Sequence, residues 1–250
     1  MKKLLSFELL KKWKTYKIAL ISVIILQAIL MLVSRLTFDN KFDIALGFIM
    51  FIYVLTIMLM FCFPLIEIMY RYNKDLSGKQ SVLELSIPII SWKKVLAKLI
   101  VSVGCIGFFI LLALASLILY SAVFGYSSET ISSDFISLFN QIIAAPDKFI
   151  IGLIYGVFTL ASFILTIYFC ITLSKVISHK NKIAVPISIG IFIAYNVALW
   201  FIAQQINKIP AVSFNLWGSN YSILASVFDI VMFALVFVGT SWLVENKIES

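Results

Sequence analysis

The sequence predicts an all-α integral membrane protein with six transmembrane helices. The 250-residue chain is 62% hydrophobic, whereas an ordinary soluble domain is roughly 45–50% apolar. Six apolar runs also reach the length of about 20 residues that a helix needs to cross a bilayer. We therefore expect one membrane domain over residues 1–250. Its spans are expected at residues 18–36, 44–70, 95–124, 149–174, 183–203 and 221–244.

Residues 1–17 are expected to form an interfacial helix ahead of the first span. Leu5, Leu9, Trp13 and Tyr16 recur at helical spacing, and lysines cluster on the opposite face. Such a helix lies along the inner membrane surface with its lysines toward head groups and cytosol. The alternative is that these lysines only anchor the chain by the positive-inside rule.

Charge asymmetry predicts the orientation of the six spans. Most of the 20 Lys and Arg residues lie in the N-terminal segment and in the connectors after the second and fourth spans. Because cytoplasmic loops are enriched in Lys and Arg, both termini are expected in the cytoplasm. The same rule accounts for the net charge of +8 without nucleic acid binding.

The hydrophilic connector between the second and third spans is expected to contain a short helix. Pro64 should kink or break the second span before this connector begins. Leu76–Ser86 can then form a helix, which Asp75 or Ser77 can cap. Pro88 ends that helix, and an aromatic and basic anchor at residues 92–94 marks the return to the membrane.

The two longer outer connectors also carry apolar residues. Within residues 125–148, the stretch 131–143 has apolar side chains at helical spacing and is expected to form a short surface helix. Residues 204–220 are expected to be interfacial or re-entrant, with Trp217 and Tyr221 at head-group depth.

Polar residues inside the spans are candidates for a substrate path, because such residues are costly in a bilayer and often functional. The candidates are Gln27, Asn196 and Asp229. The alternative is that they form hydrogen bonds between helices. Gly152 and Gly156 form a G-x-x-x-G pair, which permits close helix packing within the chain or with a second subunit.

The sequence predicts no catalytic, cofactor-binding or metal-binding residues. The single histidine, His179, lies among lysines on a short connector, whereas zinc sites need several converging ligands. Gly78 and Lys79 resemble the end of a phosphate-binding loop, but Asn73 and Gln80 stand where that motif requires Gly and Ser or Thr. If the protein uses ATP, we expect a separate chain to bind ATP and Mg²⁺ and to hydrolyse ATP.

The run YRYNKDLSGKQSVLELSIPI at residues 70–89, followed by WKK at residues 92–94, resembles the ABC-2 type transporter permeases. With six spans and a basic N-terminal helix, the chain is most similar to the compact permeases of lantibiotic-immunity and bacitracin-resistance exporters. The resemblance implies that the connector carries a coupling helix that docks on a separate ABC ATPase. The implied docking residues are Asp75, Gly78, Lys79, Leu83, Glu84 and Pro88.

The resemblance also implies a function. It implies a non-enzymatic permease subunit in a bacterial cytoplasmic membrane, paired with a second permease that is either identical or homologous. The substrate would be an amphipathic peptide antibiotic of the lantibiotic or bacteriocin type, exported for self-immunity or resistance. The alternatives are export of a lipid-linked or other amphiphile, and a scaffold or sensor subunit that transports nothing.

Overall fold

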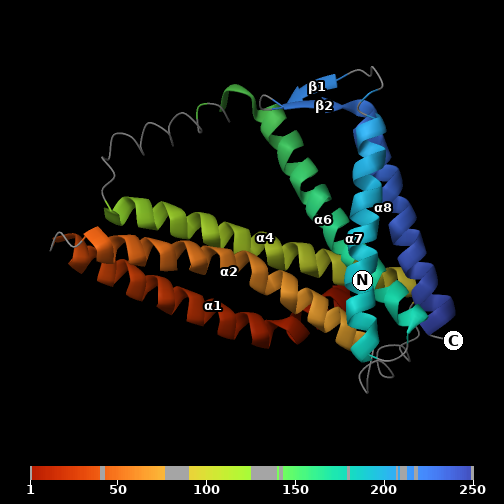
Figure 1. The fold of residues 1–250 in the computed structure, drawn as a ribbon, viewed down its shortest axis with the longest axis horizontal. Helices are drawn as coiled ribbons and strands as arrows, with labels where there is room; N and C mark the ends of the chain where they lie inside the picture. The colour runs from red at the N-terminus through yellow and green to blue at the C-terminus, as the bar shows by residue number, and fades with distance from the viewer. Residues whose placement is uncertain are drawn as a thin grey trace. The chain divides into compact units, whose positions relative to one another are not determined.

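The prediction of a multi-pass helical membrane protein is confirmed. The structure, a computed structural model (Figure 1), describes residues 2–39, 43–76, 90–124, 140, 143–178, 181–206, 208, 213–216 and 219–248. Within these residues, six helices are long and apolar enough to cross a membrane. They are α1 (Lys2–Asp39), α2 (Asp43–Asp75), α4 (Ser91–Phe124), α6 (Pro146–Ile177), α7 (Asn181–Ile206) and α8 (Ile223–Leu243).

Helix α1 runs without a break from Lys2 to Asp39. The boundary expected after residue 17 is therefore absent from the backbone, and the expected interfacial segment is the first part of one long helix. Such continuity is consistent with local sequence, because no Gly or Pro lies between residues 2 and 39 to interrupt the hydrogen-bond ladder. An interfacial position for residues 1–17 stays a prediction.

The chain divides into two compact units, and α2 and α4 each contribute residues to both. One unit, here called the N-terminal unit, comprises Lys2–Glu67 and Gly104–Pro146. The other, here called the C-terminal unit, comprises Ile68–Val103 and Asp147–Ser250.

Aromatic and apolar side chains hold the N-terminal unit together. Leu30, Ile49 and Tyr53 form a buried cluster, and the Tyr53 hydroxyl donates to the carbonyl oxygen of Ser116 at 2.8 Å. The Tyr16 ring lies 5.6 Å from that of Phe109, centroid to centroid. These contacts join α1, α2 and α4.

Helix α2 continues through Pro64, so of the expected kink or break the break is wrong, and the kink stays a prediction. Pro64 is fully buried, and neighbouring helices allow a membrane helix to tolerate the missing N–H group. One turn later, Glu67 is buried and its carboxylate accepts a hydrogen bond from the Tyr16 hydroxyl at 2.9 Å. This contact ties α1 to the second half of α2.

In the C-terminal unit, α6, α7 and α8 run alternately up and down (Figure 1). Between α7 and α8 lies an antiparallel hairpin of β1 (Ser213–Leu216) and β2 (Ser219–Ser222), with Leu216 opposite Ser219. The hairpin adds a small strand element to the expected all-α fold. After α8 the chain makes one π-helical turn, η1 (Val244–Ile248).

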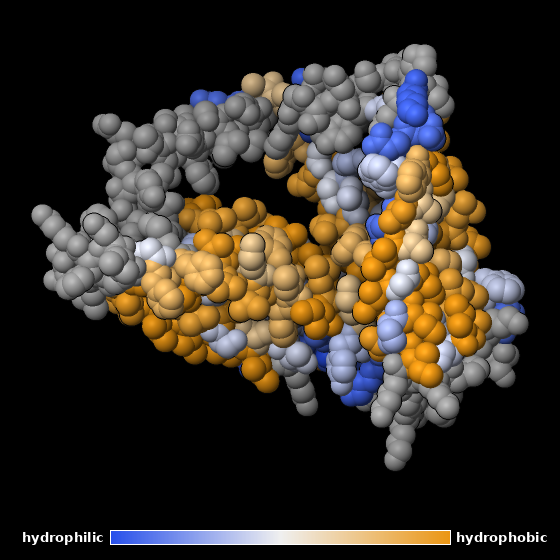
Figure 2. Space-filling model, viewed as in Figure 1, coloured by the Kyte–Doolittle hydropathy of each residue, from blue (hydrophilic) through white to orange (hydrophobic). Residues whose placement is uncertain are grey.

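Apolar side chains cover the outer faces of the long helices. Figure 2 shows hydrophobic residues along the length of α7, with hydrophilic residues gathered near its ends. Few residues of this helix are buried. In the most apolar window of Ile183–Ile206, no residue is buried within the protein. Hydrocarbon tails are the medium that suits such a surface.

Candidate functional site

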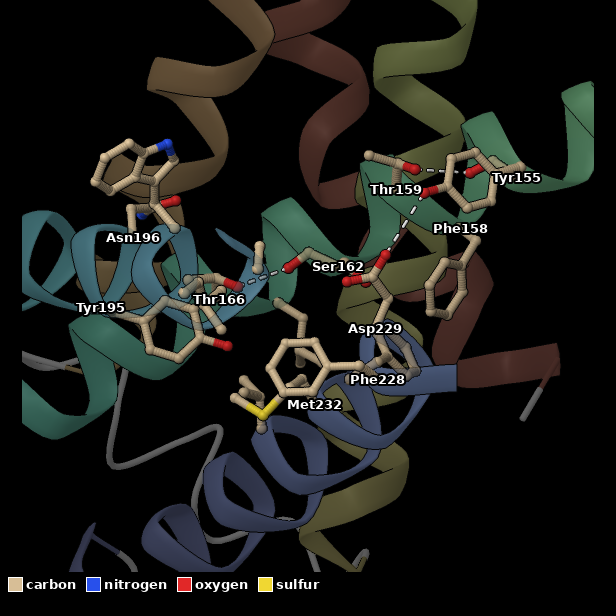
Figure 3. A pocket seen from close by; sticks show the side chains of 16 residues that line it. Tyr155, Phe158, Thr159, Ser162, Thr166, Tyr195, Asn196, Phe228, Asp229 and Met232 are labelled. Atoms are coloured by element: carbon tan, nitrogen blue, oxygen red, sulfur yellow. Dashed lines mark hydrogen bonds between the residues drawn. The ribbon is translucent and has the colours of Figure 1, made fainter. Parts of the chain in front are cut away.

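A pocket of about 360 Å³ lies among α6, α7 and α8 of the C-terminal unit (Figure 3). Its volume falls in the range of small-molecule sites, roughly 300–1,000 Å³. It contains the predicted path residues Asn196 and Asp229. The lining residues are Tyr155, Phe158, Thr159, Ser162, Leu165, Thr166, Tyr195, Asn196, Leu199, Trp200, Ala203, Phe228, Asp229, Met232, Phe233 and Val236.

Helix α6 contributes a polar stripe to this pocket. Tyr155, Thr159, Ser162 and Thr166 are spaced by four, three and four residues, so they share one face of a helix with 3.6 residues per turn. Two of these hydroxyls bond to their own helix, from Thr159 to the Tyr155 carbonyl at 2.8 Å and from Thr166 to the Ser162 carbonyl at 2.9 Å. This back-bonding satisfies the hydroxyl donors while the oxygens still face the pocket.

Asp229 is the one acidic or basic side chain among the sixteen lining residues. It lies six residues after the start of α8 at Ile223, about 9 Å along the helix. The Tyr155 hydroxyl points toward its carboxylate at an O···O distance of 3.5 Å. A separation this long gives only a weak hydrogen bond, so among the described residues the carboxylate of Asp229 has one weak donor.

Helix α7 supplies polar and aromatic groups opposite α6. The Asn196 amide donates to the Phe192 carbonyl of the same helix at 2.8 Å, which differs from the bond between helices that we weighed as the alternative. The Tyr195 ring lies beside Thr166 (Figure 3), and Trp200 lines the wall one turn further on. The pocket therefore combines a carboxylate, an amide and hydroxyls with large apolar surfaces.

A second polar site, here called the polar cluster, joins α2, α4 and α6 within the C-terminal unit. The Tyr72 hydroxyl lies 2.8 Å from that of Thr172, and the Ser102 hydroxyl lies 2.7 Å from that of Tyr168. The rings of Tyr72 and Tyr168 stack with centroids 4.0 Å apart and planes at 17°. The polar cluster consists of Tyr72, Asp75, Lys98, Ser102, Tyr168 and Thr172.

Asp75 belongs to this cluster and forms a salt bridge with Lys98. The Asp75 side chain is 3% exposed and that of Lys98 12% exposed, so the pair is largely removed from solvent. Lys98 also lies 5.9 Å from the centre of the Tyr72 ring, within cation–π distance. The structure thus places Asp75, predicted as a docking residue, in an internal contact at the end of α2.

Helix α6 carries both sites on different faces. Thr166 lines the pocket, while Tyr168 is buried in the polar cluster two residues later. Successive residues turn by about 100° on a helix, so the two side chains project about 200° apart. Helix α6 thus lines the pocket on one side and contacts α2 and α4 on the other.

Several predicted residues lie elsewhere. Gln27 is buried in the N-terminal unit, where its amide contacts the Met60 sulfur at 3.7 Å, and it is not among the pocket residues. Gly156 has open space where a Cβ atom would project, so the structure shows no close packing there within the chain. Gly152 is partly buried.

Most of the predicted docking segment lies outside the described residues. This applies to Gly78, Lys79, Leu83, Glu84 and Pro88, and to the short helix expected at residues 76–86 beyond its first residue. His179, Trp217 and almost all of the expected helix at 131–143 fall outside them as well.

The polar stripe of α6 and the polar cluster were not predicted from the sequence. The stripe carried a signal, because Tyr155, Thr159, Ser162 and Thr166 recur at helical spacing in an otherwise apolar span. No sequence pattern indicated the polar cluster, because its members come from three segments whose contacts depend on how the helices pack.

Within the described residues, no group of three or more His, Cys, Asp or Glu side chains converges as a metal site. No family model, curated protein or solved structure matches the chain.

Proposed function

We propose that this protein is the membrane subunit of an ATP-driven exporter, and that the pocket among α6, α7 and α8 holds the exported amphiphile. The observation that carries the proposal is the pocket itself, which brings Asn196 and Asp229 together inside apolar helices. An acidic side chain within an apolar span is costly where it faces lipid. A binding role accounts for its presence better than a packing role, because its one described hydrogen bond is long.

The amphipathic lining supports a membrane-derived substrate. Aromatic and aliphatic side chains supply most of the wall, and the polar groups form a stripe on α6 and single positions on α7 and α8. A molecule with an apolar part and a polar part satisfies both surfaces. An amphipathic peptide antibiotic is the proposed substrate, and a lipid-linked or other amphiphile is the alternative.

The energy is proposed to come from a separate ABC ATPase that docks on residues 77–89. These residues connect α2 to α4, and the polar cluster bonds both of these helices to α6 through the Tyr72–Thr172 and Ser102–Tyr168 contacts. A push on the connector would therefore move α6, and with it one wall of the pocket, by a rigid-body shift. In this proposal two permease chains and two ATPase chains form the complex in a bacterial cytoplasmic membrane, with the termini of each permease in the cytoplasm.

The experiment compares export in cells that lack the protein and cells that carry it. Inhibitory concentrations of amphipathic peptides and of lipid-linked antibiotics are measured for the deletion strain, for the wild type and for Asp229→Asn. Asp147→Asn removes an equal charge at the start of α6, away from the pocket, and serves as the control. Resistance restored by the wild type and the control, and lost in Asp229→Asn, supports the proposal.

Two results would count against export. Unchanged sensitivity on deletion removes the immunity or resistance role. Binding of a peptide by the purified protein, with no change in cellular accumulation, identifies instead a sensor or scaffold subunit.

A further inference from the structure

We infer that the pocket among α6, α7 and α8 selects amphiphiles with a positively charged head group, an ammonium on an alkyl or aromatic tail. This rests on the proposed function, since it names the chemical class of ligand for the same pocket. Three observations carry it: the single carboxylate of Asp229, the aromatic side chains around it, and the lack of any Lys, Arg or His among the sixteen lining residues.

The charge of the pocket lining favours a cationic ligand. Asp229 is the sole charged side chain in the lining, and among the described residues its one hydrogen-bond partner is the neutral Tyr155 hydroxyl. A carboxylate that no Lys or Arg of the described residues neutralises favours a ligand cation. An anionic head group would be repelled by the same carboxylate.

The aromatic rings favour the same kind of ligand. Figure 3 shows Tyr155, Phe158 and Phe228 around Asp229, and Tyr195 lies further along the same pocket. Aromatic faces attract ammonium groups, and cages of such rings recognise alkylated ammonium ions in particular. A carboxylate among rings therefore fits a methylated or primary ammonium better than a hydroxyl or an amide.

The size and surroundings of the pocket also suit such a ligand. A volume of about 360 Å³ is enough for an ammonium head group and part of its tail, as judged by ordinary ligand sites. Exposed apolar residues of α7 and α8 near the pocket, among them Phe201, Val227 and Ile230, form a surface that hydrocarbon suits. The remaining tail would extend along such a surface.

The test measures saturable binding to the purified full-length protein in nanodiscs of an uncharged glycolipid, which carries no ammonium group, with empty nanodiscs subtracted. The probes are dodecyltrimethylammonium, dodecanol and dodecanoate, which share one chain and differ in head-group charge. We expect dodecyltrimethylammonium to bind at least about tenfold more tightly than the other two, because only its head group is attracted both by the Asp229 carboxylate and by the aromatic faces. Results with the wild-type protein alone can overturn the inference. They do so if dodecanol binds as tightly as dodecyltrimethylammonium, or if dodecanoate binds more tightly.

Two variants locate the effect. Asp229→Asn keeps the side-chain volume and should weaken dodecyltrimethylammonium by roughly tenfold to a hundredfold while leaving dodecanol unchanged. Asp147→Asn, which removes an equal charge outside the pocket, should leave all three affinities unchanged. Equal losses in both variants would show that surface charge, and not the pocket, attracts the cation.

The inference and the proposed function fail separately. Selective binding of the cation with no export in cells would leave the inference standing and refute the exporter. Export with no preference among the three head groups would do the reverse.

Discussion

Breaking the salt bridge between Asp75 and Lys98 by replacing one partner should destabilise the C-terminal unit more than most single substitutions do. Both side chains are mostly buried, at 3% and 12% exposure. Removing one partner of a buried ion pair typically costs about 3–5 kcal/mol. We therefore expect Asp75→Asn and Lys98→Met each to lower the free energy of unfolding by about 3 kcal/mol.

The double variant tests whether the two losses share one cause. With both charges removed, neither charge is left buried without the other, so the total loss should be smaller than either single loss and far below their sum of about 6 kcal/mol. The coupling energy would then be at least about 3 kcal/mol, at the upper end of the range for residues in contact. Lys148→Met serves as a control, because Lys148 is exposed on the first turn of α6.

The assay is unfolding in mixed micelles with increasing sodium dodecyl sulfate, followed by far-ultraviolet circular dichroism. Free energies of the four proteins of the cycle are compared at one detergent composition. Losses that add to about 6 kcal/mol in the double variant would show that Asp75 and Lys98 do not interact, and would refute the account of the polar cluster.

Three further predictions concern other parts of the chain. Tyr53→Phe should lower stability by about 1 kcal/mol in the same unfolding assay, since it removes the 2.8 Å bond to the Ser116 carbonyl and keeps the ring; an unchanged midpoint contradicts this. Gly156→Leu should leave the stability of a single chain within about 0.5 kcal/mol, because open space surrounds the missing Cβ, but should weaken pairing of two chains in chemical cross-linking if this face packs against a second subunit. Leu83→Ala with Glu84→Ala should abolish co-purification of an ATPase subunit without changing the unfolding midpoint, and retained ATPase activity in the purified complex would remove these residues from the docking site.

The six spans could be predicted because the bilayer imposes a requirement that a sequence shows directly. About 20 apolar residues must follow one another, and α7, for example, runs from Asn181 to Ile206 around the expected span of 183–203. Helix ends were less predictable. Helix α1 begins at Lys2 and α2 passes through Pro64, because a helix can continue into the interface and packing can tolerate one proline.

The hairpin between α7 and α8 carried a signal that the hydropathy pattern obscured. In Ser213–Leu216, polar and apolar residues alternate, as they do in a half-exposed strand. Only Trp217 and Gly218 separate it from Ser219–Ser222, a spacing typical of a two-residue hairpin loop. This alternation covers only four residues between long apolar runs, so it was not recognised as a strand.

The candidate site was predictable only in part. Asn196 and Asp229 stood out because polar side chains are costly in a span, and packing brings them to one pocket. Gln27 met the same criterion but lies in the N-terminal unit beside Met60. Asp75 was assigned to docking by resemblance, and its partner Lys98 follows 23 residues later in sequence. Such a pairing depends on the packing of α2 against α4, which no local pattern encodes.

The most direct test of the central claim is to find where a transported amphiphile sits. A dodecyltrimethylammonium analogue with a photoreactive diazirine in its tail is cross-linked in native membranes, and the labelled peptides are identified by mass spectrometry. The account predicts labels on the pocket-facing residues of α6, α7 and α8, competed by unlabelled ligand and lost in Asp229→Asn. Labels confined to other helices, or labels on these three that persist equally in Asp229→Asn, would contradict it.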